Sequence, residues 1–184
     1  MSRAPSDRFA PAWLALREGY DHAARSKPLA RAFLRSLPRG ACIADLACGS
    51  GANARYLSSL GRRDLCWDLI DADPALLTIA EGGDARRLDL ARPRRSLDLG
   101  RCHGVTASAF LDLVSGPWID ALIGDAARHG LPMLFALTVD GRVAFSPGDA
   151  GDGALLNGFR RDQRRDKGFG PALGPDAPRR LAAA

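Results

Sequence analysis

The chain has 184 residues, which suits one hydrophobic core, and its 46% apolar and 26% charged residues are typical of a globular protein. No apolar run approaches the length of a membrane span, and residues 1–13 lack the apolar stretch of a secretory signal, so we expect a cytoplasmic protein without a membrane partner. The net charge is +5, but the basic residues, all arginine except Lys27 and Lys167, are interleaved with aspartate, a pattern that disfavours a nucleic-acid partner.

Strand and helix patterns alternate along the chain. The expected helices cover 11–17, 27–37, 52–60 and 154–165, with further helix starts at 73–74 and 116–117. The expected strands cover 41–46, 65–70, 86–90, 102–107 and 131–139, and 142–145 should pair back after a turn at 140–141. This alternation predicts an α/β fold, a Rossmann-like three-layer sandwich with a mostly parallel central sheet.

The cysteines carry no metal or redox signature. They form no C-x-x-C pair, and no Cys/His cluster has zinc spacing. The sequence therefore predicts reduced thiols and no bound metal. The four residues are Cys42, Cys48, Cys66 and Cys102.

The strongest signal for function is the stretch I-A-D-L-A-C-G-S-G at 43–51, where a buried strand enters a glycine loop followed by a helix. The missing side chains at Gly49 and Gly51 let a ligand lie against the backbone, and the next helix offers unpaired N–H groups. Dinucleotide-binding loops need a third glycine, where Ala54 and Arg55 follow instead. A phosphate-binding P-loop is excluded too, because no Gly-Lys-Ser/Thr follows.

This stretch resembles motif I of the class I S-adenosylmethionine-dependent methyltransferases, in which an acidic residue, an apolar residue and a small pair precede Gly-x-Gly. The resemblance implies S-adenosyl-L-methionine as the cofactor. By the same resemblance, Gly49 and Gly51 face its methionine part, with Ala47 in the same loop, and Asp45 helps to position it.

A second match lies about twenty residues further on, where Leu69-Ile70-Asp71 ends the next strand. A carboxylate there can accept hydrogen bonds from both ribose hydroxyls, and the family has an acidic residue at this point. Asp71, with Ala72 beside it, is therefore the predicted ribose site. Asp73 is better explained as the N-cap of the helix that begins at Pro74.

Two weaker matches complete the predicted cofactor site. Asp89 stands where the family places an acidic residue near the adenine amino group, although a surface aspartate at a strand end would look the same. Ala107 and Ser108 resemble the strand end beside the methyl group. The family usually opens that strand with an aromatic-Asp pair, and here His103 occupies the acidic position.

The resemblance covers about residues 15–150 and implies a domain organisation. Residues 1–40 should form an N-terminal helical segment covering the pocket, and 41–184 the cofactor-binding domain. The family core has seven strands, but only five and a hairpin partner can be placed. We therefore expect a sheet that lacks the last strands, as in a truncated chain or a compact variant.

Methyl transfer from a sulfonium needs mainly proximity and orientation, with a base only if the acceptor must lose a proton. Candidate catalytic residues are His22 as a base, Tyr20 as an orienting group and Asp112, one turn after the fourth strand. His22 also fits a surface or capping histidine. The charged stretch 160–171 suits an anionic acceptor, or simply a solvated helix face.

The sequence thus predicts an enzyme that methylates a small molecule, with an anionic acceptor as the option that the stretch 160–171 suggests. Two alternatives remain open. One is a nucleic-acid or protein methyltransferase, although the chain lacks the Asn/Asp-Pro-Pro-aromatic motif of adenine methylation and the Pro-Cys pair of cytosine methylation. The other is a non-catalytic cofactor-binding protein or fragment, which His103 and the missing strands favour.

Overall fold

A computed structural model of the chain describes residues 9–92 and 97–183. The chain divides into two compact units. Unit 1 comprises Met1–Ala107 with Leu131–Leu134, and unit 2 comprises Ser108–Gly130 with Phe135–Ala184.

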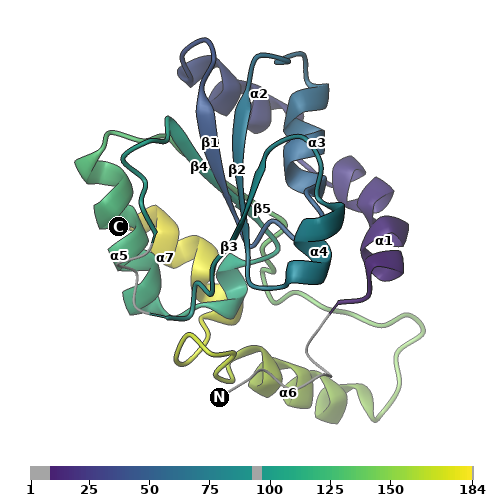
Figure 1. The fold of residues 1–184 in the computed structure, drawn as a ribbon. Coiled ribbons are helices and arrows are strands. Elements are labelled where there is room, and N and C mark those ends of the chain that lie inside the picture. Colours follow the sequence, from purple (N-terminus) through teal and green to yellow (C-terminus); the bar gives the residue numbers. More distant parts are fainter. Residues whose placement is uncertain (1–8, 93–96, 184) are drawn as a thin grey trace. The chain divides into compact units, whose positions relative to one another are not determined.

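Five strands form one sheet in the order β3-β2-β1-β4-β5 (Figure 1). β1 pairs in parallel with β2 and with β4, and β2 pairs in parallel with β3. This arrangement confirms the predicted Rossmann-like α/β fold, and within the described residues the sheet has no strand beyond these five. The strands are β1 (Cys42–Leu46), β2 (Cys66–Asp71), β3 (Asp84–Arg87), β4 (Gly104–Ser108) and β5 (Met133–Ala136).

The helices of unit 1 begin where the sequence supplies caps and prolines. Ser26 Oγ accepts a hydrogen bond from Leu29 N at the start of α2, and Asp73 caps α4 by accepting one from Ala75 N. α3 and α4 provide the crossovers that consecutive parallel strands require. These helices are α1 (Pro11–Ala23), α2 (Lys27–Ser36), α3 (Ala52–Ser59) and α4 (Pro74–Ile79).

The core of unit 1 surrounds β1. Four of its five residues have no exposed surface, as expected for a strand covered on both faces. Phe33 of α2, Leu57 of α3 and Trp67 of β2 belong to the same apolar cluster. One of the four fully buried β1 residues is the carboxylate Asp45, which the apolar pattern alone does not explain.

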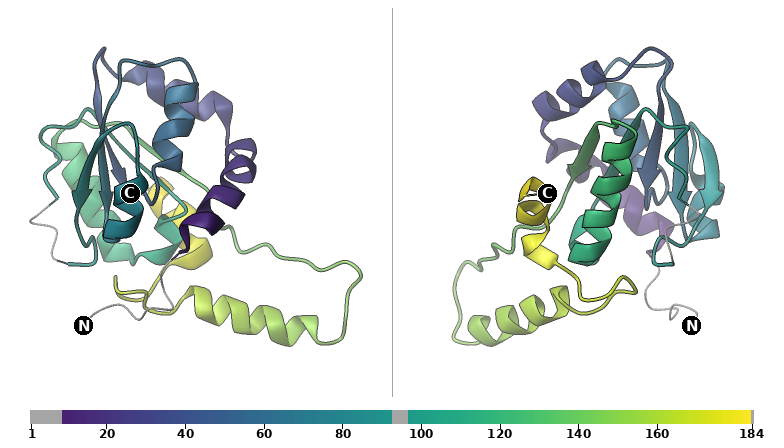
Figure 2. Two further views of the ribbon diagram at one scale, coloured as in Figure 1. Left: turned by 45° about the vertical axis from the view of Figure 1, so that its right-hand side comes forward. Right: turned by 90° about the vertical axis from the view of Figure 1, so that its left-hand side faces the viewer.

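Unit 2 is built around three aromatic rings in edge-to-face contact, Phe110, Trp118 and Phe169, with centroids 5.3–5.9 Å apart. α6 has no buried residue, and in both views of Figure 2 it extends away from α5 and α7, together with the segment that precedes it. The elements are η3 (Leu111–Leu113), α5 (Gly116–Arg128), α6 (Asp152–Gln163), η4 (Gly174–Asp176) and α7 (Ala177–Ala183).

The predicted hairpin partner at 142–145 is wrong, because these residues form no strand. The Asp140 carboxylate accepts hydrogen bonds from Arg142 N at 3.0 Å and from Arg142 Nε at 2.6 Å, a local turn that competes with strand pairing. The segment is also exposed, so it has no buried face that would fix a register. Smaller differences concern bounds: the third strand is Asp84–Arg87, and the first helix continues to Ala23.

The described residues contain no helix long and apolar enough to cross a membrane. The four cysteines are free thiols. In the part of the chain that the structure describes, no group of three or more His, Cys, Asp or Glu side chains has the arrangement of a metal site.

Candidate cofactor site

The glycine loop between β1 and α3 is a tight turn with three left-handed residues. The φ angles are +52° at Ala47, +56° at Gly49 and +84° at Gly51. A Cβ on Gly51 would lie 3.4 Å from Arg55 Nη1, and one on Gly49 would lie 3.7 Å from Leu14 Cδ1. Ala47 adopts this conformation without being glycine, a strain that proteins usually keep only at functional sites.

Asp71 holds this loop from the end of β2. One carboxylate oxygen accepts a hydrogen bond from Gly49 N at 2.8 Å, and the other accepts one from Asp73 N at 2.9 Å. Each carboxylate oxygen has two acceptor sites, so both retain capacity for a further donor. The structure thus brings two of the predicted ligand residues, Asp71 and Gly49, into direct contact at the carboxyl edge of the sheet, with Ala72 exposed beside them.

Asp45 supplies a buried acceptor to the same region. Its Oδ1 accepts a hydrogen bond from Asn53 Nδ2 at 2.7 Å, while its Oδ2 is buried and has no hydrogen-bond partner. Burial raises the pKa of Asp45 to about 7, against the opposing effects of the Asn53 hydrogen bond and the Arg25 charge. A buried carboxylate oxygen without a donor is costly unless a ligand completes it, so the residue fits a cationic or hydrogen-bond-donating group.

Three residues that the sequence analysis did not single out hold Asp45 in place. Asn53 Nδ2 also contacts Thr106 Oγ1 at 3.1 Å, and Thr106 Oγ1 donates to Leu134 O at 2.8 Å. Arg25 Nη1 donates to Asn53 Oδ1 at 2.5 Å, and its guanidinium stacks over a tyrosine ring of α3, 4.8 Å from the centroid. Arg25, Asn53 and Thr106 are all buried.

α1 lies against the glycine loop. Glu18 accepts two hydrogen bonds from Arg55, at 2.9 and 2.7 Å, and Arg55 Nη1 donates to Ser50 O at 2.6 Å. The hydrogen bonds from Arg55 lower the pKa of Glu18 below its usual value. The helix is therefore tied to the loop by a bidentate, charge-assisted contact.

The predicted catalytic residues of α1 have different surroundings. His22 Nε2 lies 3.1 Å from Ala52 O, at the first residue of α3, and 3.7 Å from Glu18 Oε1. Because a carbonyl only accepts hydrogen bonds, this contact requires a proton on Nε2, which leaves Nδ1 as the acceptor in the neutral ring. Tyr20 is 79% exposed.

The remaining predicted cofactor residues lie at the ends of β3 and β4. Asp89 follows Leu88, whose N–H donates to Asp71 O at 2.9 Å. The Asp89 carboxylate accepts from Ala91 N and lies 3.4 Å from Arg92 Nε. Ala107 is paired in register with Leu46 at the end of β1.

Ser108 and Asp112 belong to unit 2. Ser108 ends β4, and Asp112 lies in η3. Asp112 Oδ1 is buried without a hydrogen-bond partner, and burial raises the pKa of this carboxyl. It is therefore the carboxylate in this unit with the strongest sign of a missing donor.

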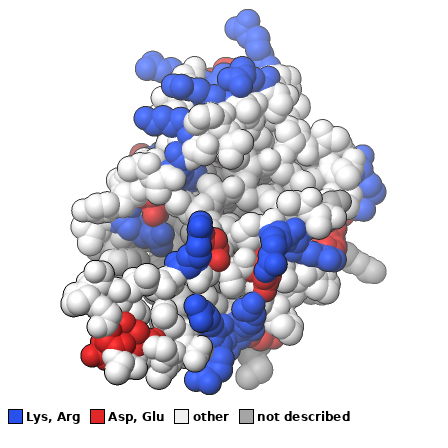
Figure 3. All heavy atoms as spheres, turned by 180° about the vertical axis from the view of Figure 1, so that it is seen from behind, with Lys and Arg blue, Asp and Glu red and all other residues white. Residues whose placement is uncertain are grey.

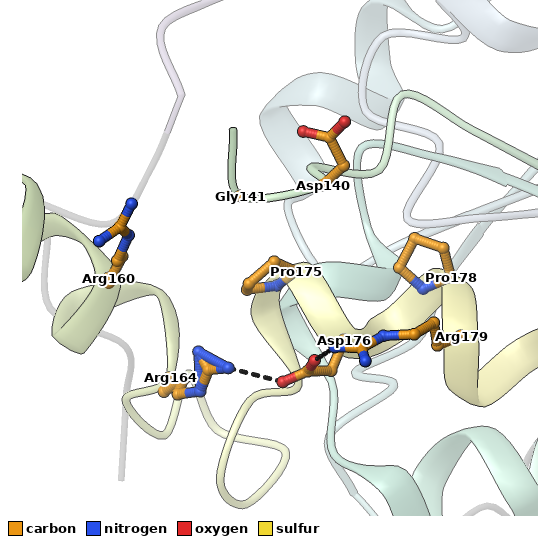
Figure 4. A pocket seen from close by; sticks show the side chains of 8 residues that line it. All are labelled: Asp140, Gly141, Arg160, Arg164, Pro175, Asp176, Pro178 and Arg179. Carbon is orange, nitrogen blue, oxygen red and sulfur yellow. Dashed lines mark hydrogen bonds and ion pairs between the residues drawn. The ribbon is translucent and has the colours of Figure 1, made fainter. Parts of the chain in front are cut away.

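Unit 2 also contains a cavity of about 460 Å³ between α6 and the start of α7 (Figure 4). Arg164 and Arg179 both pair with Asp176, the former at 2.6 Å. Arg160 and Asp140 line the same cavity. Three arginines against two aspartates give its lining a net positive charge.

Comparison with known proteins places the fold. No protein-family model and no curated protein matches the chain. Among solved structures, it is similar to a SAM-dependent methyltransferase from Aquifex aeolicus, with a TM-score of 0.53 and 11% identity over 85% of this chain and 88% of that one.

Two further similar structures are the sugar N-methyltransferase KedS8 from Streptoalloteichus sp. ATCC 53650 (TM-score 0.51) and DesVI from Streptomyces venezuelae (TM-score 0.50). Each is 18% identical over 78% of this chain, and the chain spans 62% of the length of each. The chain therefore has the fold of the class I S-adenosylmethionine-dependent methyltransferases, as the motif I resemblance implies.

Proposed function

We propose that the protein is an S-adenosylmethionine-dependent methyltransferase that acts on a small molecule. The main support for this proposal is the arrangement at the glycine loop of a chain with a methyltransferase fold. Gly49 N donates a hydrogen bond to Asp71, and Asp45 Oδ2 is buried without a hydrogen-bond partner. The amino acid part of the cofactor offers hydrogen-bond donors that the Asp45 carboxylate could accept, and the ribose hydroxyls could donate to the remaining acceptor sites of Asp71.

The cofactor's chemistry, when it is bound, is an activated methyl group on a sulfonium. The chain's own residues then bind, orient and exclude water, which is the principal contribution to an in-line displacement. Ala47, Gly49 and Gly51 would approach the methionine part through their backbone, and Asp89 would lie toward the adenine. Ala107 and Ser108 would border the methyl group.

His22 is the preferred base where the acceptor must lose a proton. Its Nε2 contact with Ala52 O fixes the tautomer whose Nδ1 accepts protons. Asp112, with its buried unpartnered oxygen, is the second candidate, and Tyr20 remains the predicted orienting group.

Two observations support a small, anionic acceptor over a nucleic acid. The cavity of unit 2 has a positively charged lining. Several basic side chains elsewhere form ion pairs with carboxylates, such as Arg86 with Asp68, and Figure 3 shows on one face both basic groups beside acidic ones and basic groups apart from them. KedS8, a sugar N-methyltransferase, is an example of this fold acting on a small molecule.

The second candidate function is a cofactor-binding protein without transferase activity. His103, at the position where the family has an acid, favours it: its Nδ1 accepts a hydrogen bond from Cys42 N, a contact within the sheet. The two functions differ in turnover and not in cofactor binding.

The test is a thermal-shift measurement with S-adenosylhomocysteine, followed by transfer of a labelled methyl group to a panel of small carboxylates, phosphates and amino sugars. At about 100 times Kd the ligand should stabilise the fold by about 2.7 kcal/mol. For a chain of this size that raises Tm by roughly 5–10 °C. Absence of a shift at millimolar ligand in the folded protein would overturn both functions, and a shift without turnover on any acceptor would favour the second.

A further inference from the structure

Two cysteines stand side by side at the amino edge of the sheet. Cys42 opens β1, Cys66 opens β2, and the two are partners in the parallel register. Their Sγ atoms are 3.0 Å apart. Because registered residues on neighbouring strands point to the same face, the strand pairing keeps the two side chains next to each other.

The backbone geometry also suits a covalent link. Neighbouring strands lie about 4.8 Å apart, and disulfides join Cα atoms that are about 4.4–6.8 Å apart. The spacing of the paired strands therefore falls within the Cα range of disulfides, and the two sulfur atoms must approach by about 1 Å from their 3.0 Å separation.

The two thiols differ in access. Cys66 is exposed, so a reagent in solvent reaches its sulfur directly. Cys42 is half-buried, and burial together with the Cys66 hydrogen bond raises the pKa of its thiol to about 12. Attack from outside should therefore begin at Cys66, with Cys42 as the resolving thiol.

We propose that Cys42 and Cys66 form a dithiol modification site that low-molecular-weight disulfides oxidise to an intramolecular disulfide. In the first step, the Cys66 thiolate attacks one sulfur of the reagent, forms a mixed disulfide and expels one thiolate. In the second step, Cys42 Sγ attacks Cys66 Sγ and expels the other. Two protein thiols are oxidised, the reagent's S–S bond is reduced, and the two released protons go to the leaving thiolates or to solvent.

The position of the site predicts its consequence. The disulfide would join the amino ends of β1 and β2, whereas Asp45 and Asp71 lie toward their carboxyl ends. Oxidation should therefore leave cofactor binding intact and stabilise the fold by constraining the unfolded chain between residues 42 and 66. The proposal does not depend on the proposed function.

The experiment exposes the reduced full-length protein to oxidised glutathione under native conditions, blocks remaining thiols with N-ethylmaleimide, and measures the intact mass and tryptic peptides. Wild type should lose two hydrogen atoms and yield a link between Cys42 and Cys66. Because Cys42 and Cys48 share one tryptic peptide, fragment spectra must place the bond. Measured without reductant, the Tm of the oxidised protein should be higher than that of the reduced protein.

Matched variants separate the two steps. Cys42→Ser should stop at a glutathione adduct on Cys66, and Cys66→Ser should leave Cys42 without a glutathione adduct. Cys102→Ser, which removes a buried thiol, should behave as wild type. The proposal fails if wild type retains the adduct on Cys66, links another pair, or stays unmodified while the same protein in urea reacts fully.

Discussion

The glycine loop of unit 1 and the α6 region of unit 2 are built in opposite ways. Around the loop, Asp45 and Asn53 are buried, and hydrogen bonds link the loop to β2. α6 buries no residue and exposes Leu155 and Phe159. The difference shows that the proposed cofactor site lies on a junction held by several hydrogen bonds, whereas α6 has few contacts that fix it.

The largest effect is expected from Gly51→Val in the loop. Valine at φ +84° is strained, and its side chain would contact Arg55, so cofactor binding should be abolished. Gly61→Val is the matched control, because Gly61 has φ +105° and open space around its Cβ. Calorimetric titration with S-adenosylhomocysteine measures the affinity of both variants, and circular dichroism checks that both are folded. If the Gly51 variant retains its affinity, the cofactor does not bind against this loop.

Asp45→Asn should change how stability depends on pH. Asp45 has a folded pKa of about 7, above its unfolded value of about 3.9, so its contribution to stability is present below pH 4 and is lost as the pH rises to 7. Across that window wild type should lose stability relative to the variant, by up to about 4 kcal/mol. Urea unfolding at pH 4 and pH 8 tests this, and a constant difference between the two proteins would contradict it.

Asp71→Ala removes the acceptor that holds Gly49 and the proposed ribose. Charged hydrogen bonds contribute about 1.5–3 kcal/mol each, so affinity for S-adenosylhomocysteine should fall by roughly one to two orders of magnitude. Asp73→Ala, which removes the cap of α4, should cost about 1 kcal/mol of stability and leave affinity unchanged. Equal affinities for wild type and the Asp71 variant would place the ribose elsewhere.

The smallest effects are expected in unit 2. Phe169→Ala removes one ring of the aromatic cluster and should cost about 2 kcal/mol, because this side chain is only partly buried. Leu155→Ala on α6 should change stability by less than about 0.5 kcal/mol, since the residue is 62% exposed. Denaturant midpoints for the pair measure the difference, and a large loss for Leu155 would show that α6 is covered by a partner.

The parts of the fold that the sequence predicts are those determined locally. The strand, glycine loop and helix from β1 to α3 follow from an apolar run, two glycines and a helix start. The prediction of a hairpin partner at 142–145 was wrong because the Asp140 carboxylate accepts the hydrogen bond of the Arg142 backbone N–H. Strand periodicity in the sequence does not show such a local side-chain contact. α1 extends past its predicted end because Glu18 and His22 contact α3, a tertiary effect.

The candidate site also has residues that the sequence marks and residues that only the tertiary structure brings together. Motif spacing predicts that Asp45, Gly49 and Asp71 lie at neighbouring strands, and the structure brings Gly49 and Asp71 into contact, while their role as cofactor ligands stays a prediction. Arg25, Asn53 and Thr106 could not be predicted, because the fold brings them together from positions separated by 28 and 53 residues. No local pattern marks a buried arginine that positions a carboxylate through an asparagine.

Hydrogen exchange of the wild-type protein with and without S-adenosylhomocysteine tests the central claim most directly. If the cofactor binds at the glycine loop, exchange should be slower at 47–53, at 71–73 and around residue 89 in unit 1, and unchanged across α6. Unchanged exchange in those three segments at saturating ligand, or protection confined to unit 2, would contradict it.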